Sequence, residues 1–596
     1  WHLDLGPPLA VEVGPLDMTW GQGELGVVAR ILPAEGTIGG TVTAERVHLA
    51  HILQSVSVVT GPWVDFEGDV EVHVDGTLSP LRLEGPFEVD VGDLAVTNGP
   101  FDDPKVDLVL GVPAVTVQGK VSITLEELLF DARVATRQSQ GHARASIGLG
   151  EHGPLAIDVD FPRLDLTQIR PLGGSELGGM ARVEGFFGGP WESMGASADI
   201  EVTDAVVLGF PVADKLRTHL ESDLQSLFFT DIQAELGATR YQGSFTLGLA
   251  DPMSIDTQIY VPSGRIHDLA GVFVDIGPAD GAVSGVVDLA GPIYDLDGDV
   301  TLGLADVDLY GEHFPQGSIV ASMDDGELTL HSLALGREIE AGRKESVLAR
   351  GSVKRGWAMN VEVLGDGLSL ATLDHLRDQG LPLAGNLQVD AQIGGTLFDP
   401  EPRGRITATQ TFYDGTGLAD TSVAFRTTDG VLAWEGTLLG DAMRARGTLG
   451  LWDQQPYEAE AWLSGFPLHL FYPRGADGRR LEARLTGDVS LAGHFGDQPS
   501  PVDIDGRFDE VFAKWSGHTL RAPEPWVFAV HGTSVQVSRL RLLGDDGTDV
   551  GFEGYATGQG RLAFRGGGQV SLDLARAFVP DLQVAQGTAD VDMSIE

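Results

Sequence analysis

The chain has 596 residues and a formal net charge of −48 at pH 7, and it contains 80 glycines but no cysteine. The acidic balance argues against nucleic-acid binding, because phosphate neutralisation needs clustered Lys and Arg. It also argues against the body lying flat on an anionic bilayer. The lack of cysteine excludes disulfides, thiol nucleophiles and Cys-ligated zinc.

The start of the chain shows no secretory signal pattern, and no run of 18 apolar residues occurs anywhere. We therefore predict no membrane-spanning helix. Because the first residue is Trp1 rather than Met, we expect a processed or excised piece of a longer protein, whose membrane anchor lies outside this segment.

A pattern of about a hundred residues recurs along the chain. It consists of an anchor glycine, a strand of alternating apolar and polar residues, a proline, and a glycine that opens another alternating strand. In LAGNLQVDAQIGGTLFDPEPRG these landmarks are Gly385, Pro400 and Gly404. The anchors Gly68, Gly178, Gly281, Gly385 and Gly487 lie 110, 103, 104 and 102 residues apart.

The spacing divides the chain into repeats. We predict the tail of a preceding repeat at 1–67, repeats at 68–177, 178–280, 281–384, 385–486 and 487–586, and the start of a truncated repeat at 587–596. Strands spaced every 8–12 residues would give each repeat roughly seven to nine strands.

A short helix is predicted shortly before each anchor, where a strand pattern passes into Pro or Gly. The six segments are VHLAHILQSV at 47–56, LDLTQI at 164–169, RIHDLAGVF at 265–273, LSLATLDHL at 368–376, LHLF at 468–471 and LDLARAF at 572–578. The segment KLRTHLESDLQSLFF comes nearest to a longer helix, but its periodicity is weak.

Period-two alternation gives each strand one apolar and one polar face. The residues predicted to form an apolar groove are Val70, Val72, Val74, Val287, Leu289, Leu387, Val389, Ala391, Ile393, Val489 and Leu491. We predict an all-β fold with a few short helices: an elongated, repetitive sheet curled into a trough, or taco-like β-solenoid, with an apolar interior. That interior must either pack on itself or hold a ligand.

Three segments are weak ligand-site candidates. GQGELG at 21–26 matches a dinucleotide-binding fingerprint, but VVARILPAEG, which follows it, is too short for the required helix. DLDGDV at 295–300 has alternating carboxylates but lacks the Gly and Glu positions of an EF-hand loop. HLAH at 48–51 has no third metal ligand. We predict no catalytic residue, no metal site, no cofactor and no enzymatic activity.

The repeat pattern resembles the TamB/AsmA-like superfamily of Gram-negative envelope proteins, and the segments GGTLFDPEPRG at 394–404 and DGTLSPLRLEG at 75–85 resemble it most. GGPWESMG and AGHFGDQPSPVDIDG depart from the Gly-Thr-Leu form. The resemblance implies a periplasmic protein tethered to the inner membrane by a segment absent here. It also implies phospholipid acyl chains as cargo, transport between the two membranes, and partner proteins in both.

A continuous apolar groove would suit acyl chains as cargo, because exposing each acyl CH₂ to water costs about 0.8 kcal/mol. Two alternatives stay open at this stage: a scaffold for assembling outer-membrane proteins or autotransporters, which would share the fold, and a structural β-solenoid at the cell surface. A solenoid should show shorter rungs than the observed period.

Overall fold

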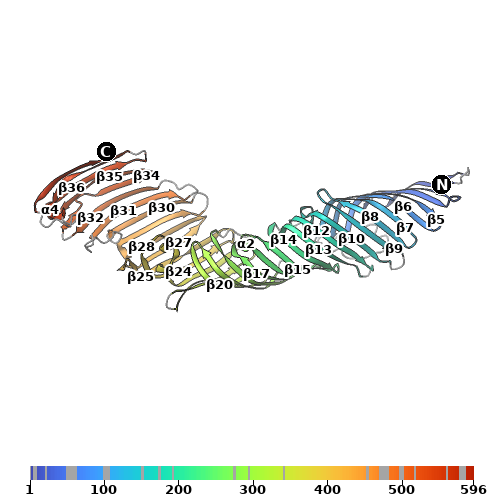
Figure 1. Ribbon diagram of the computed structural model, residues 1–596, viewed down its shortest axis with the longest axis horizontal. Coiled ribbons are helices and arrows are strands. Elements are labelled where there is room, and N and C mark those ends of the chain that lie inside the picture. The colour runs from blue at the N-terminus through green and yellow to red at the C-terminus, as the bar shows by residue number, and fades with distance from the viewer. Residues whose placement is uncertain are drawn as a thin grey trace. The chain divides into compact units, whose positions relative to one another are not determined.

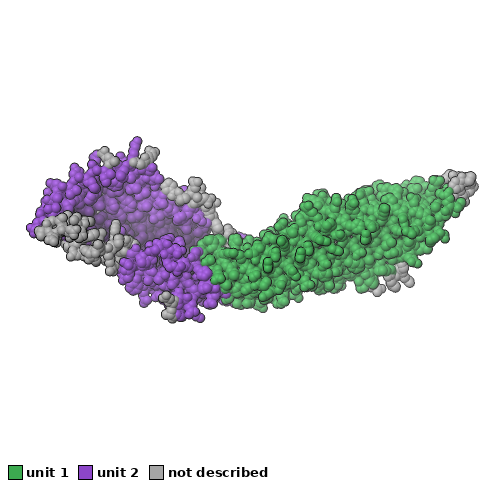
Figure 2. All heavy atoms as spheres, in the orientation of Figure 1, with its two compact units in different colours: residues 1–310, 318–328 green, residues 311–317, 329–596 purple. Residues whose placement is uncertain are grey.

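The computed structural model describes most of the chain. The described residues are 2–4, 10–20, 23–48, 63–97, 108–149, 153–171, 176–190, 193–207, 209–250, 252–272, 277–292, 295–339, 342–451, 455–468, 482–495, 502–515, 518–558, 561–575 and 586–595. They form strands almost throughout, which confirms the all-β prediction. The chain divides into two compact units, coloured separately in Figure 2.

Unit 1 comprises Trp1–Tyr310 and Ser318–Leu328. Its strands are β1 (His2–Asp4), β2 (Ala10–Trp20), β3 (Gly23–Leu32), β4 (Thr37–His48), β5 (Trp63–Leu78), β6 (Leu81–Thr97), β7 (Leu108–Thr124), β8 (Glu127–Ala135), β9 (Gln140–Gly148), β10 (Leu155–Asp165), β11 (Arg170–Pro171), β12 (Leu177–Gly189), β13 (Gly195–Val207), β14 (Phe210–Ser222), β15 (Ser226–Leu236), β16 (Thr239–Gly248), β17 (Ser254–Arg265), β18 (Ala279–Pro292) and β19 (Asp297–Leu309).

Unit 2 comprises Gly311–Gly317 and Thr329–Glu596, and β20 (Glu312–Asp324) and β21 (Glu327–Ile339) contribute residues to both units. Its other strands are β22 (Arg343–Val353), β23 (Met359–Ser369), β24 (Leu383–Gly395), β25 (Pro400–Tyr413), β26 (Thr416–Gly417), β27 (Thr421–Thr428), β28 (Val431–Leu438), β29 (Met443–Gly450), β30 (Pro456–Phe466), β31 (Glu482–His494), β32 (Asp503–Trp515), β33 (His518–Arg521), β34 (Trp526–His531), β35 (Ser534–Gly544), β36 (Asp549–Ala556), β37 (Leu562–Ser571) and β38 (Thr588–Ile595).

Each unit is an antiparallel meander, in which a long strand pairs with the long strands before and after it in the sequence (Figure 1). The alternating sequences explain this, because β-branched residues on every second position suit a pleated surface. The helix-like segment KLRTHLESDLQSLFF forms the second half of β14 and the start of β15 instead. Cross-strand pairing therefore overrides its weak helical periodicity.

The predicted repeats contain the strand sets β5–β11, β12–β17, β18–β23, β24–β30 and β31–β37. Among the described residues, three sets have seven strands when the short β11, β26 and β33 are counted, which is the lower end of the predicted seven to nine, whereas β12–β17 and β18–β23 have six. Those two sets fall below the predicted number because their strands are long, with 10 to 14 residues each.

Short helices follow β10, β17, β23 and β37, in segments where the sequence predicts them. They are η1 (Leu166–Gln168), α2 (Ile266–Ala270), η4 (Leu370–Thr372) with α3 (Asp374–Asp378), and α4 (Leu572–Ala575). Most of the predicted segments 47–56 and 468–471 lies outside the described residues. A further single turn, η5 (Gly440–Ala442), was not predicted.

A β-bulge recurs opposite a glycine in the first strand of each repeat. The ladders shift register at the predicted anchors Gly68, Gly281, Gly385 and Gly487. In the second repeat the shift lies at Gly179, one residue after the predicted anchor Gly178. A Cβ on Gly281 would lie 2.9 Å from Cα of Val307, one of the two bulge residues opposite it. The anchor glycines therefore leave room for the bulged backbone of the next strand.

Small buried clusters lie on one side of the sheet rather than in one central core. One contains Phe87, Val121 and Ala132, with Val72 and Val74 packed against it. Another contains Ala181, Val202, Ala205, Ala213 and Ala234. Both lie in unit 1, on the face that carries the predicted groove residues.

Candidate apolar groove

The two faces of each strand differ in chemistry and burial. On β24, Ala391 is buried and Leu387, Val389 and Ile393 are partly buried, whereas the intervening Gln388 is exposed. We call the face that carries Val72 in unit 1 and Ala391 in unit 2 the apolar face, and the opposite one the polar face.

Strand pairing brings the predicted groove residues into shared rows, because residues directly opposite each other in an antiparallel ladder point to the same face. In unit 1, Val72 and Leu289 belong to one such row. In unit 2, Ala391 and Leu491 belong to one row, and Val389 and Val489 belong to the next. The remaining predicted residues lie on the same faces by alternation: Val70, Val74, Val287, Leu387 and Ile393.

The row through Val72 crosses unit 1 from β2 to β19. In pairing order it contains Leu16, Val27, Val42, Val72, Phe87, Gly119, Ala132, Ala143, Val159, Gly185, Ala198, Leu220, Phe229, Phe245, Thr257, Leu289 and Gly298. Thr257 is its one polar member. Because neighbouring strands lie ~4.8 Å apart, the row runs on the order of 75 Å.

The row through Ala391 crosses unit 2 from β22 to β37 with no polar member. It contains Ala349, Val363, Ala391, Gly404, Phe425, Trp434, Gly447, Ala459, Leu491, Ile504, Val530, Val535, Ala556 and Leu562. The neighbouring row through Val389 and Val489 is likewise apolar, from Val347 through Ile406 and Phe528 to Ile595.

The apolar face of unit 2 is only partly covered by the described residues. Leu491 remains 36% exposed and Ile406 37% exposed. A hollow of about 630 Å³ is lined by Met443, Ala461 and Leu463 together with Val489 and Leu491. An ordinary closed core would bury such side chains almost completely.

Aromatic rings on this face lie over glycines of the adjacent strand. A Cβ on Gly506 would lie 2.1 Å from the Phe528 ring, and one on Gly447 would lie 2.8 Å from the Trp434 ring. A ring that occupies the gap above a glycine covers backbone rather than standing out from the sheet. Large side chains are therefore accommodated on the apolar face without filling the space above it.

One buried hydroxyl group on the apolar face has a backbone partner. The Tyr241 hydroxyl donates a hydrogen bond to the carbonyl oxygen of Val212 at 2.5 Å. Burial raises the pKa of Tyr241 to about 12, so the hydroxyl stays protonated and able to donate. The side chain therefore adds no charge to this face.

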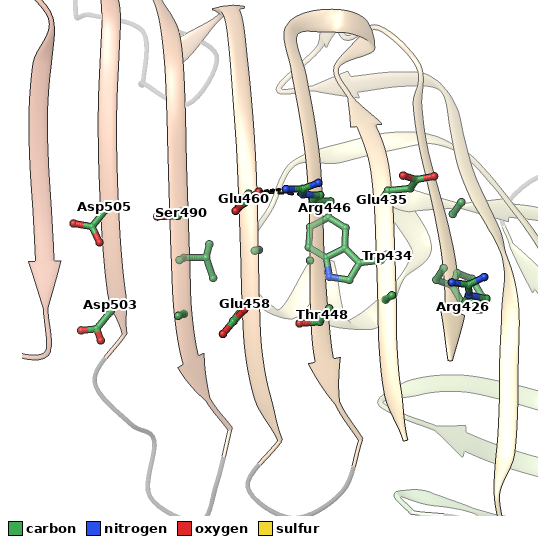
Figure 3. A pocket seen from close by; sticks show the side chains of 17 residues that line it. Arg426, Trp434, Glu435, Arg446, Thr448, Glu458, Glu460, Ser490, Asp503 and Asp505 are labelled. Atoms are coloured by element: carbon green, nitrogen blue, oxygen red, sulfur yellow. Dashed lines mark hydrogen bonds and ion pairs between the residues drawn. The ribbon is translucent and has the colours of Figure 1, made fainter. Parts of the chain in front are cut away.

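The polar face carries cross-strand ion pairs. A hollow of about 790 Å³ lies on this face. At this hollow, Nη2 of Arg446 lies 2.7 Å from a carboxylate oxygen of Glu460 (Figure 3). Glu435, Glu458, Asp503 and Asp505 also line it, so carboxylates outnumber the two guanidinium groups. The face is not uniformly polar, since Phe186 and Trp462 are also exposed there.

Histidines on the polar face of unit 1 pair with carboxylates. Nδ1 of His219 lies 2.7 Å from Oδ1 of Asp199, and this hydrogen bond raises the pKa of His219. His142 makes an equivalent contact with Asp131, also at 2.7 Å, which lowers the pKa of Asp131. These pairs hold neighbouring strands together on the wet side of the sheet.

The described residues of the three weak ligand-site candidates, GQGELG, DLDGDV and HLAH, lie mainly in strands. Gly23–Gly26 opens β3, so no helix follows the GQGELG segment, and Asp297–Val300 opens β19. His48 ends β4, and the rest of HLAH lies outside the described residues. Within the described part of the chain, no group of three or more His, Cys, Asp or Glu is arranged to hold a metal ion.

A buried charge cluster in unit 2 was not foreseen from the sequence. Arg337 is 8% exposed and Glu345 1% exposed, and Nε of Arg337 donates to Oε2 of Glu345 at 2.6 Å. Glu312 and Asp374 approach the same guanidinium group at 3.4 and 3.6 Å. Only the fold brings these distant residues together, so no sequence spacing could have revealed the cluster.

No helix in the described ranges is long and apolar enough to cross a membrane. Comparisons with models of protein families, with curated proteins and with solved structures found no match to this chain. The geometry of the two faces is therefore the main evidence for the function of this chain.

Proposed function

We propose that the apolar face lines a groove that carries phospholipid acyl chains, and that the chain is part of a lipid-transfer bridge between two membranes. The observation that carries this proposal is the apolar row that crosses each unit, through Val72 in unit 1 and Ala391 in unit 2. An acyl chain moving along such a row stays out of water at each step.

The dimensions of the apolar face suit this cargo. Leu387, Val389, Ala391 and Ile393 cover six residue steps, or ~20 Å of strand. One leaflet of a bilayer's hydrocarbon core is ~15 Å thick, because both leaflets together are about 30 Å. The face is therefore wide enough for a single acyl chain, while the polar head group can lie at the hydrated edge.

The proposed cellular location and partners rest on the sequence resemblance. We propose that the protein belongs with the TamB/AsmA-like envelope proteins, that it lies in the periplasm of a Gram-negative bacterium, tethered to the inner membrane, and that proteins of both membranes are its partners. No catalytic group is needed for passive transfer along a groove, so we propose that it is not an enzyme. A scaffold for assembling outer-membrane strands would have the same fold.

The structural β-solenoid is less well supported. A parallel β-helix has parallel rungs of short strands, whereas the long strands here pair antiparallel. The partly exposed Leu491 and Ile406 also favour a face with a ligand over a filled interior.

Lipid analysis of gently purified protein tests the proposal. We expect native mass spectrometry to find phospholipid bound to the wild-type chain, and we expect Val389→Glu and Leu491→Glu to lose it while keeping their strand content. A carboxylate on the apolar face disfavours acyl chains because an unpaired charge is costly to desolvate.

Matched controls place the same charge on the other face. Gln388→Glu and Ser490→Glu change exposed neighbours on β24 and β31, and we expect both to retain lipid. If Val389→Glu and Leu491→Glu unfold the chain while the controls fold, the apolar face is a packed core and the proposal is wrong. Wild-type protein without bound phospholipid would contradict it as well.

A further inference from the structure

The turn between β22 and β23 has an unusual composition for this acidic chain. It reads Lys-Arg-Gly-Trp at 354–357, and all four residues are exposed. The amide of Lys354 donates a hydrogen bond to the carbonyl oxygen of Ala358 at 2.8 Å. The amide of Trp357 donates one to the carbonyl oxygen of Lys354 at 2.9 Å. The turn therefore has a defined backbone that presents two cations and an indole ring together.

Trp357 is held in a conformation that bulky residues avoid. Its φ of 66° lies in the left-handed region, which is costly for a residue with a large side chain. The neighbouring turn between β24 and β25 supports it, because the amide of Leu397 donates to the carbonyl oxygen of Trp357 at 2.9 Å. Backbone strain that neighbours maintain at an exposed position is typical of functional sites.

The two turns together present a pair of aromatic rings. Trp357 packs against Phe398 edge-to-face, with ring centroids 5.7 Å apart. Both rings remain about half exposed, Trp357 at 47% and Phe398 at 56%. Because both rings stay this exposed while in contact, the pair forms an apolar tip beside the cations.

The local charge differs from that of neighbouring turns. Alternate turns of a meander lie on the same edge of the sheet, so the turns after β24 and β27 lie on the edge that carries Trp357. These turns contain Asp399 and Asp429 respectively, and neither contains Lys or Arg. The cations at 354 and 355 are therefore a local departure from the acidic character of the chain.

We propose that this tip, Lys354–Trp357 with Phe398, docks on the surface of a bilayer that contains anionic phospholipid. Lys and Arg are attracted to the negative surface, and Trp is favoured at the level of the head groups. Screening within about 10 Å limits the repulsion from acidic residues farther away. The inference does not depend on whether the apolar face carries acyl chains, because the tip lies beyond the strand ends.

Vesicle flotation tests the inference with the full chain. We expect wild type to bind vesicles of phosphatidylglycerol mixed with phosphatidylcholine. Lys354→Gln with Arg355→Gln should weaken this binding about 30-fold, since each cation near an anionic surface contributes about one kilocalorie per mole. Trp357→Asn should weaken it as well, and it should fold normally because Asn tolerates a left-handed backbone.

Two control variants make the same kinds of change at positions outside the tip. Lys120→Gln with Arg133→Gln removes two exposed cations from the polar face of unit 1. Phe495→Ala removes another exposed ring, 58% accessible and paired with Tyr457 in unit 2. We expect both controls to bind vesicles as wild type does.

Three results would overturn the inference. The first is a wild-type chain that does not float with the anionic vesicles. The second is unchanged binding when the tip residues are replaced. The third is loss of binding with the cation variant but not with Trp357→Asn, which would show that charge attraction alone holds the chain on the vesicle and that the aromatic tip does not dock.

Discussion

At the scale of residues, the structure explains why glycine occupies the anchor position of a repeat. Gly385 has a φ of 147°, and a Cβ there would lie 3.0 Å from Cα of Thr411 and 3.2 Å from the oxygen of Gln410. The regular spacing of anchors seen in the sequence thus corresponds to a recurring bulge. The sequence marked these positions but did not reveal the bulge, because the contact involves the next strand.

Replacing this anchor should loosen the repeat. We expect Gly385→Ala to destabilise the β24–β25 ladder by about 1–3 kcal/mol, because the added Cβ strains the backbone and meets the bulge. Hydrogen exchange of the β24 and β25 amides measures the effect locally. Gly394→Ala is the control, since its Cβ would meet only the oxygen of Glu401 at 4.0 Å. Equal exchange in both variants would refute the role of the bulge.

The His219–Asp199 pair should make the stability of the fold depend on pH. The pKa of His219 is raised in the folded chain by its hydrogen bond to Asp199. Its contribution to stability is therefore fully present below the unfolded pKa, about 6.5. That contribution is lost as the pH rises through the folded value.

Histidine C2-hydrogen exchange followed by mass spectrometry can measure this pKa. We expect His219 to titrate above about 6.5 in wild type and nearer that value in Asp199→Asn. Identical titration in the two proteins would show that the pair has no effect on the pKa.

At the scale of elements, α3 is fixed by the buried charge cluster. Glu312 accepts hydrogen bonds from the amides of Asp374 and His375, at 3.1 and 3.2 Å, at the start of the helix. Arg337 approaches the carboxylates of Glu312, Glu345 and Asp374. A helix of five residues has little stability of its own, so these contacts hold it against the sheet.

Removing the cation should release this helix. We expect Arg337→Met to destabilise the region by about 3–5 kcal/mol, because it leaves buried carboxylates unpaired. The readout is faster hydrogen exchange in α3 and β22. Arg350→Met is the control, because Arg350 pairs with Glu362 on the surface and such pairs contribute about 0–1 kcal/mol. Unchanged protection of α3 in Arg337→Met would contradict its role.

Local patterns show how far the sequence determined these elements. Alternation correctly assigned the face of Leu387 and Val389, and the breaks before Pro or Gly correctly placed α2 and α3. Strand length was underestimated, since alternation continues through residues that look like turns, as at Gly119 within β7. Register could not be predicted, because it depends on which strands meet. The rows that connect Val72 with Leu289 are therefore a structural finding.

At the scale of the whole molecule, repetition and charge have complementary effects. Repeated sets of six or seven strands extend an apolar face along each unit, as the rows through Val72 and Ala391 show. The net charge of −48 favours solubility of a chain with so much apolar surface, because like-charged molecules repel each other. Neither feature requires a catalytic site, and both suit a passive carrier.

The central claim is that phospholipid contacts one face of the strands and not the other. Because the chain has no cysteine, single cysteines can be introduced along β5 and β24 and labelled with a photoactivatable benzophenone. We predict phospholipid crosslinks at Val70, Val72 and Val74 but not at Glu71 and His73, with the same alternation along β24. Crosslinks at every position, or at none, would contradict the account.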